Sequence, residues 1–166
     1  MSTSAKDAFL SSYEREHATT MKVLRAFPPD RIDLRPHPRL KTAKELAWMF
    51  AMERMLGTAV LNDALMRLMQ GATPPPPQEW EDVLAKVEQT HRDFGDLVRA
   101  LPDEKLRGTV KFFTGPGTIG DVPCIDFCWF LLFDEIHHRG QFSVYLRLAD
   151  GKVPSIYGPS GDEPWR

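Results

Sequence analysis

Hydrophobic positions recur three and four residues apart in four long segments of this chain. That spacing is typical of helices that bury one face against a core. The pattern predicts a first helix that reaches about Ala26, a second from Thr42 to about Gln70, a third from about Glu79 to Leu101, and a fourth within the stretch from Asp121 to Gly151.

Capping residues and helix breakers mark the ends of these segments. Ser4 can cap the first helix, which Pro28 and Pro29 stop. Thr42 and Glu45 have the spacing of a capping box at the start of the second helix, and Gly71 ends it. Four prolines, 74 to 77, then predict an extended polyproline linker.

Between the third and fourth helices, residues 109–113 favour a short paired strand and residues 114–120 a loop. The glycines of this loop do not form a phosphate-binding motif. Pro116 interrupts them, and no strand-to-helix βαβ unit surrounds them. A nucleotide site is therefore not expected.

Four amphipathic helices predict an all-α fold, a four-helix bundle, in a single domain over residues 1–166. The linker bears on the topology. Residues 72–78 span only about 20 Å in polyproline form, at ~3.1 Å per residue, whereas a 29-residue helix is ~43 Å long. On that estimate alone the second and third helices would be antiparallel.

The charge balance and the distribution of apolar residues argue against a nucleic-acid-binding, membrane or secreted protein. The chain has 166 residues, 21 basic against 23 acidic side chains and a pI near 6.2, so no nucleic acid or anionic membrane is expected as a partner. No apolar run is long enough to span a bilayer, and the first residues do not resemble a signal peptide. We expect a soluble cytoplasmic protein whose two cysteines, Cys124 and Cys128, are small buried residues.

Ionisable side chains occupy expected core positions on three of the helices: His17, Glu53, and the pair Asp134 and His138. Each lies near the middle of its helix, so a bundle could bring them together. Convergent carboxylates and imidazoles on facing helices form metal sites, because a divalent cation compensates their buried charge. A metal-free hydrogen-bonded network is the alternative, and the pattern does not decide between them.

Three neighbours on the fourth helix complete the candidate site. His137 faces roughly 100° away from His138 and could support it from outside the ligand set. Arg139 and Gln141 could orient the ligands or a substrate. His91, on the third helix, is expected to be a core histidine.

Three segments carry a family resemblance. EIHHRGQFSVYLR (135–147) and VPSIYGPSGDE (153–163) look like the C-terminal part of DinB-like proteins, and TAKELAW (42–48) resembles the start of their second helix. This is the DNA-damage-inducible DinB/YfiT group of metal-dependent enzymes. The resemblance implies a bundle of up-down-down-up order, usually a homodimer, with a divalent metal in its core. That order conflicts with the linker estimate, and we favour it because the matching motif is long.

The resemblance also implies a metal held by one histidine on the second helix and by two, four residues apart, on the fourth. Carried over, these positions fall on Met49, Asp134 and His138. A thioether would not hold zinc, nickel or manganese. We therefore expect Glu53, one turn after Met49, to replace it, giving Glu53, Asp134 and His138 with His17 as a candidate fourth ligand. Two carboxylates favour a harder metal than three histidines do.

Two functions follow. The resemblance implies an enzyme, a thiol-dependent transferase or a hydrolase, that uses Zn, Ni, Mn or Fe, and by analogy a low-molecular-weight thiol, on an unidentified small-molecule substrate. The alternative is a metal-free, dimeric, stress-related bundle that binds a small ligand or a protein. A zincin-type protease is set aside, because residues 135–138 have neither the HExxH order nor its reverse.

Overall fold

The computed structural model describes residues 4–165; Met1–Thr3 and Arg166, which the predicted domain and the reading of the N-terminus include, lie outside it. The elements are α1 (Ala5–Arg25), a 3-10 turn η1 (Pro29–Arg31), α2 (Ala43–Leu61), α3 (Leu65–Gln70), α4 (Trp80–Ala100), α5 (Asp103–Arg107), β1 (Thr109–Gly115), β2 (Thr118–Pro123) and α6 (Cys124–Leu148). None of the helices in this range has the length and apolar character needed to cross a membrane.

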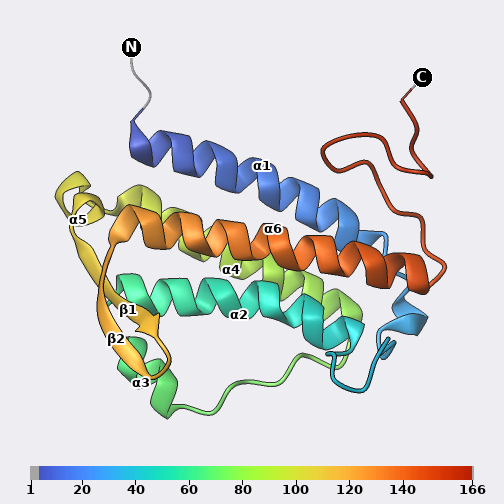
Figure 1. The fold of residues 1–166 in the computed structure, drawn as a ribbon, viewed down its shortest axis with the longest axis horizontal. Coiled ribbons are helices and arrows are strands. Elements are labelled where there is room, and N and C mark those ends of the chain that lie inside the picture. Colours follow the sequence, from blue (N-terminus) through green and yellow to red (C-terminus); the bar gives the residue numbers. More distant parts are fainter. Residues whose placement is uncertain (1–3, 166) are drawn as a thin grey trace.

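The long helices α1, α2, α4 and α6 form a four-helix bundle (Figure 1). Helix α6 packs against α1 and α2, and α4 packs against the same two helices from the other side. Figure 1 shows α1 and α6 running in one direction and α2 and α4 in the other. This is the up-down-down-up order, so the antiparallel arrangement expected from the linker estimate is wrong.

The linker estimate failed because the second helix is shorter than its apolar pattern suggests. Helix α2 ends at Leu61, and Asp63 adopts the left-handed conformation (φ 55°) before the separate short helix α3. A 19-residue helix is ~28 Å long, and residues 71–79 can span about as much in extended form. The linker therefore runs back along the bundle (Figure 1), where Trp48 Nε1 donates to the Pro74 carbonyl at 2.9 Å.

Both predicted helix caps are present. The Ser4 side chain accepts a hydrogen bond from the Asp7 amide, and Thr42 with Glu45 forms the complete capping box. The strand expected at residues 109–113 also forms, as part of an antiparallel hairpin in which Phe112 pairs with Gly120. The expected loop was too long, because the chain turns tightly at Gly117 (φ 67°) and continues into β2.

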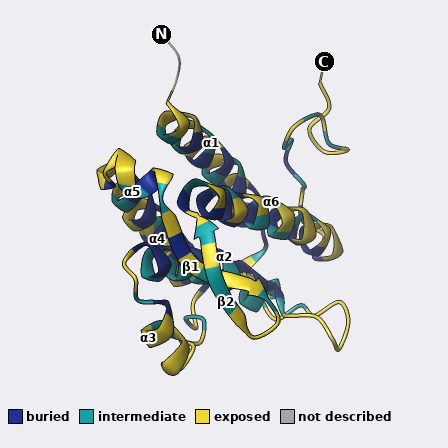
Figure 2. Ribbon diagram, turned by 60° about the vertical axis from the view of Figure 1, so that its left-hand side comes forward, coloured by how far each residue is buried: buried dark blue, intermediate teal, exposed yellow. Residues whose placement is uncertain are grey.

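Apolar side chains fill the bundle in two clusters, one towards each end. Figure 2 shows that buried and exposed positions alternate along the helices. One cluster contains Phe27, Trp80 and Phe142, and the other contains Phe9, Phe94 and Phe127. The C-terminal segment packs against the first cluster through Ile156, while Trp165 is 70% exposed.

Candidate metal centre

A layer of polar side chains lies between the two apolar clusters, at the middle of every long helix. Its buried members are Glu16 and Thr20 on α1, Glu53 and Arg54 on α2, Thr90 and His91 on α4, and Glu135 and Arg139 on α6. Burying this many polar groups is unfavourable unless each finds a partner, so their contacts show how the layer is organised.

Glu53, Asp134 and His138 meet at one edge of this layer, between α2 and α6. Each offers a ligand atom, and these atoms lie within 4.8 Å of one another. The Glu53 side chain is 6% exposed, that of His138 17% and that of Asp134 34%, so the cluster is closed on the bundle side and reachable past Asp134. Helical spacing explains Asp134 and His138, which are one turn apart on α6.

The carboxylate and imidazole atoms of this cluster are buried close to one another. Both Glu53 carboxylate oxygens and His138 Nδ1 are buried without a hydrogen bond to any described residue. Nδ1 of His138 lies 2.5 Å from Glu53 Oε1, a close contact between an imidazole and a carboxylate, and 3.9 Å from Asp134 Oδ1. Buried atoms of this kind normally have partners. A divalent cation among them would supply one, and two carboxylates with one imidazole suit Zn²⁺, Mn²⁺ or Fe²⁺.

The pKa values of the cluster reflect the same arrangement. Burial raises the pKa of the Glu53 carboxyl group, because a charged carboxylate is poorly solvated there. The adjacent Glu53 carboxylate raises the pKa of His138 above its ordinary value of 6.5. The contact with Glu53 thus favours the charged imidazole of His138, and His138 only partly offsets the cost of burying the Glu53 charge.

Behind the cluster, the polar layer continues as ion pairs. Arg54 forms an ion pair with Glu135 between α2 and α6, and the Thr20 hydroxyl donates to Glu135 Oε1 at 2.7 Å. The sequence pattern did not single out Arg54 and Glu135. They lie next to Glu53 and Asp134 in the chain, and charged residues beside expected ligands were a signal that could have found them.

Arg139 does not have the expected orienting role at the ligands, because its side chain turns to the α1 side. Its guanidinium lies 2.8 Å from Glu16 Oε2 and donates at 2.5 Å to the Tyr157 hydroxyl. The Tyr157 hydroxyl in turn donates to Glu16 Oε2 at 2.6 Å. Arg139 thus joins α6, α1 and the C-terminal segment.

Gln141 and His137 also differ from expectation. Gln141, which was expected to orient the ligands or a substrate, is exposed, and its side-chain nitrogen lies 3.0 Å from Nε2 of His137, which is exposed too. The two residues form a surface pair one turn apart. Neither is buried with the cluster of three.

His17, the candidate fourth ligand, is held elsewhere in the layer. Its ring stacks on His91 with centroids 3.5 Å apart, and Tyr13 stacks on the other face of His91 at 4.1 Å. Burial lowers the pKa of His91 to about 3, so it is neutral at physiological pH. The prediction that His91 is a core histidine is confirmed, since only 3% of it is exposed.

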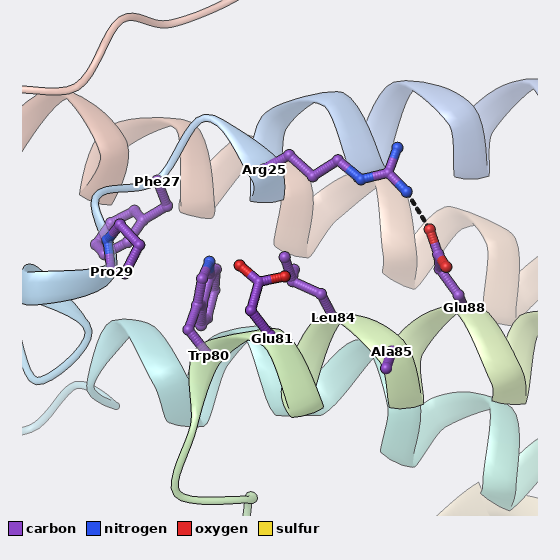
Figure 3. Close-up of a pocket in the computed structure, with 8 residues that line it drawn as sticks. All are labelled: Arg25, Phe27, Pro29, Trp80, Glu81, Leu84, Ala85 and Glu88. Carbon is purple, nitrogen blue, oxygen red and sulfur yellow. Dashed lines mark hydrogen bonds and ion pairs between the residues drawn. The ribbon is translucent and has the colours of Figure 1, made fainter.

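Two cavities of the bundle lie outside the cluster, because neither is lined by Glu53, Asp134 or His138. Met49, at the position where the family resemblance implies a histidine, is half-buried and lines a cavity of about 340 Å³ between α2 and the polyproline linker, together with Lys41 and Met52. Figure 3 shows a different cavity, of about 390 Å³, between α1 and α4, where Arg25 pairs with Glu88. It is lined by none of the three cluster residues.

Comparison with known proteins matches nearly the whole chain to one family and to a relative from Bacillus subtilis. The family model described as "DinB family" matches residues 1–165. YrdA of Bacillus subtilis (strain 168), itself described as uncharacterized, is 26% identical over 159 residues, which cover 95% of this chain and 90% of YrdA.

Solved structures support the same fold. A DinB-like protein from Bacillus cereus ATCC 10987 superposes with a TM-score of 0.73 at 21% identity, over 90% of this chain and 95% of that one. YfiT from Bacillus subtilis has a TM-score of 0.67 at 14% identity, over 92% and 91% of the chains. YfiT is described as a probable metal-dependent hydrolase with an unusual four-helix bundle topology.

Proposed function

This chain belongs to the DinB family, and we propose that it is a metal-dependent enzyme whose ion is held by Glu53, Asp134 and His138. The observation that carries the proposal is the convergence of Glu53, Asp134 and His138, whose candidate ligand atoms lie within 4.8 Å of one another at the edge of the buried polar layer. Asp134 lies within the same 4.8 Å group and is the member most exposed to solvent.

Hydrolysis of a small molecule is the reaction that we propose first, by analogy with the description of YfiT. The chemistry that a divalent ion supplies in such a site is a nucleophile at neutral pH, because the pKa of a coordinated water or thiol falls. Thiol-dependent transfer, which the family resemblance implies, is the second form of the proposal.

The protein's own groups have distinct roles in this proposal. Glu53 is nearly enclosed and supplies a carboxylate whose position the bundle fixes, while the partly exposed Asp134 leaves a side from which substrate can enter. The Arg54–Glu135 ion pair joins α2 to α6 directly behind the cluster and so holds Glu53 opposite His138. The apolar clusters at both ends of the bundle keep water from the rest of the interior.

Elemental analysis of untagged protein tests the metal. We expect about one equivalent of a transition metal per chain after reconstitution with zinc, manganese or iron, and at least tenfold weaker retention in Glu53→Gln and in Asp134→Asn. Asp96→Asn is the matched control, because Asp96 is an exposed carboxylate on α4. Equal retention in all four proteins would refute the assignment.

A second assay separates hydrolysis from thiol-dependent transfer. Metal-loaded protein is incubated with an aryl ester in thiol-free buffer, and in parallel with added low-molecular-weight thiol. Turnover without thiol, lost in Glu53→Gln, supports the hydrolase. Turnover only with thiol, and a thioester or thioether product, supports the transferase.

The alternative is a metal-free bundle that binds a small ligand or a partner protein, and Met49 favours it. Met49 replaces a family histidine with a soft thioether that does not hold zinc, nickel or manganese. NMR titration of His138 distinguishes the two. In a metal-free protein the nearby Glu53 raises its pKa and the ring titrates; with a metal bound, His138 does not titrate near neutral pH.

A further inference from the structure

A second feature of the molecule has the character of a ligand site: an aromatic cavity between the hairpin and the first half of α6. We call it the hairpin cavity. Its volume is about 610 Å³, within the range of small-molecule sites. It is lined by Phe112, Phe113 and Gly115 of β1, Val122 of β2, and Asp126, Phe127 and Phe130 of α6.

The aromatic wall of the hairpin cavity is held in place from within. The Phe112 ring lies 4.8 Å from that of Phe127, which is fully buried in the core, and 5.7 Å from that of Phe130. Phe113 and Phe130 are nevertheless 40% and 48% exposed. Exposed aromatic rings on an anchored wall are unfavourable in water and well suited to receive another flat apolar group.

The charge at the hairpin cavity limits what it can bind. A neighbouring cavity of about 580 Å³, lined by Asp126, Trp129, Phe130 and Phe133, continues along α6. Of the described residues that line the two cavities, only Asp126 is ionisable, and it is exposed at their shared boundary. A negative charge without a basic partner disfavours anionic ligands and is compatible with neutral or cationic ones.

The position of the hairpin cavity connects it to the candidate metal centre. Phe130 and Asp134 are one turn apart on the same side of α6. Along the helix axis, the midpoint between Phe127 and Phe130 lies ~11 Å from the midpoint between Asp134 and His138, at a rise of 1.5 Å per residue. A molecule of two or three rings' length can therefore reach both places at once.

We propose that the hairpin cavity is the substrate subsite of this protein. It binds a planar aromatic group, uncharged or cationic, of a small molecule whose polar reacting group lies at Glu53, Asp134 and His138. The position of the reacting group rests on the proposed function; the binding of the aromatic group does not.

Fluorescence titration with N-phenyl-1-naphthylamine, an uncharged aromatic probe, tests the subsite. We expect saturable binding at one site per chain, weakened at least tenfold in Phe130→Ser and in Phe113→Ser. Val144→Ser is the matched control, because Val144 is an exposed apolar residue (58%) further along α6. Circular dichroism melting of each variant shows whether it is folded. Unchanged binding in both folded phenylalanine variants, or an equal loss in Val144→Ser, would overturn the subsite.

Two further experiments test the charge preference of the hairpin cavity and whether a second copy of this chain fills it. The anionic probe 8-anilino-1-naphthalenesulfonate should bind more weakly than the uncharged one, and Asp126→Asn should reduce that difference; equal binding of both probes contradicts the charge argument. Sedimentation is run on wild type and Phe130→Ser. If a wild-type dimer dissociates in the variant while the probe fails to bind the dimer, the hairpin cavity is an interface between copies and the proposal is wrong.

A separate NMR experiment tests whether a molecule in the hairpin cavity lies close to the proposed metal ion. In protein loaded with Mn²⁺, the NMR lines of the bound uncharged probe should broaden, whereas Glu53→Gln should bind the probe equally well without broadening. Mn²⁺ binding without broadening overturns the link alone. Absence of Mn²⁺ binding overturns the proposed metal site, and the link with it, while the probe titration still decides the aromatic subsite.

Discussion

Arg54 and Glu135 form a buried ion pair that joins α2 to α6, with side chains only 4% and 1% exposed. Each is the sequence neighbour of a residue in the candidate metal centre, Arg54 of Glu53 and Glu135 of Asp134. Arg54 also donates to the Phe50 carbonyl at 2.7 Å and lies over the Tyr13 ring. The pair therefore holds together the two helices that carry the candidate metal centre.

Removing one partner of this pair should be strongly destabilising. Arg54→Met leaves the Glu135 charge buried and uncompensated, and we expect a loss of about 3–5 kcal/mol in the free energy of unfolding, measured with urea. The double variant Arg54→Met/Glu135→Leu should recover much of the loss. Arg92→Met, at an exposed arginine on α4, is the control, and an equal effect there would contradict this account.

Placing a histidine at position 49, where the family resemblance implies one, should strengthen metal binding. Met49 lies one turn before Glu53 on α2, and Met49→His adds an imidazole on the same face. We expect at least a tenfold gain in zinc affinity, measured by competition with a chromogenic chelator. Met52→His serves as a control for an added histidine, since Met52 is also half-buried on α2 and lines the same cavity as Met49. A gain of equal size there would argue against a site at Met49.

Acid should weaken the contact between α1 and the C-terminal segment. Burial alone would raise the pKa of Glu16, but hydrogen bonds from Tyr157 and Arg139 outweigh it and hold the pKa below 4.5. A carboxyl group with a depressed folded-state pKa stabilises the protein above its unfolded pKa, and this contribution is lost as the pH falls through the folded value. Unfolding free energy should therefore drop below about pH 4.5, and Glu16→Gln should flatten that drop. A profile of unchanged slope in the variant would be incompatible with this explanation.

Gly140 offers a test of the outer face of α6. It is exposed in the middle of the helix, and an added Cβ would meet nothing within 4 Å. Gly140→Ala should stabilise the isolated chain by about 0.5–1 kcal/mol, because alanine is the better helix former. Gly57→Ala is the contrast, since its Cβ would lie 2.6 Å from atoms of Leu131 and Phe94 and should destabilise. Destabilisation by Gly140→Ala would indicate that another copy packs on this face, and sedimentation would show it.

The candidate cluster was predictable in part. Helical spacing places Asp134 and His138 on one face and Glu53 in an apolar stripe, and the family resemblance narrowed the candidates to these three, whose ligand atoms the structure brings together. The same argument chose His17 and failed, because spacing gives the direction of a side chain from its own helix but not the neighbour it meets. His17 meets His91, 74 positions away in the chain, and stacks on its ring.

By itself, the sequence determined the four long helices in outline, two of their caps, the family and the positions of the candidate side chains on their own helices, because capping, periodicity and breakers act over a few residues. Only the tertiary structure decided the break after Leu61, the parallel course of α2 and α4, and the partners within the polar layer. The Thr20–Glu135 and Arg54–Glu135 contacts join residues 115 and 81 positions apart. Whether a charged side chain is buried depends on such distant partners, since a charge enters the core only where another helix compensates it.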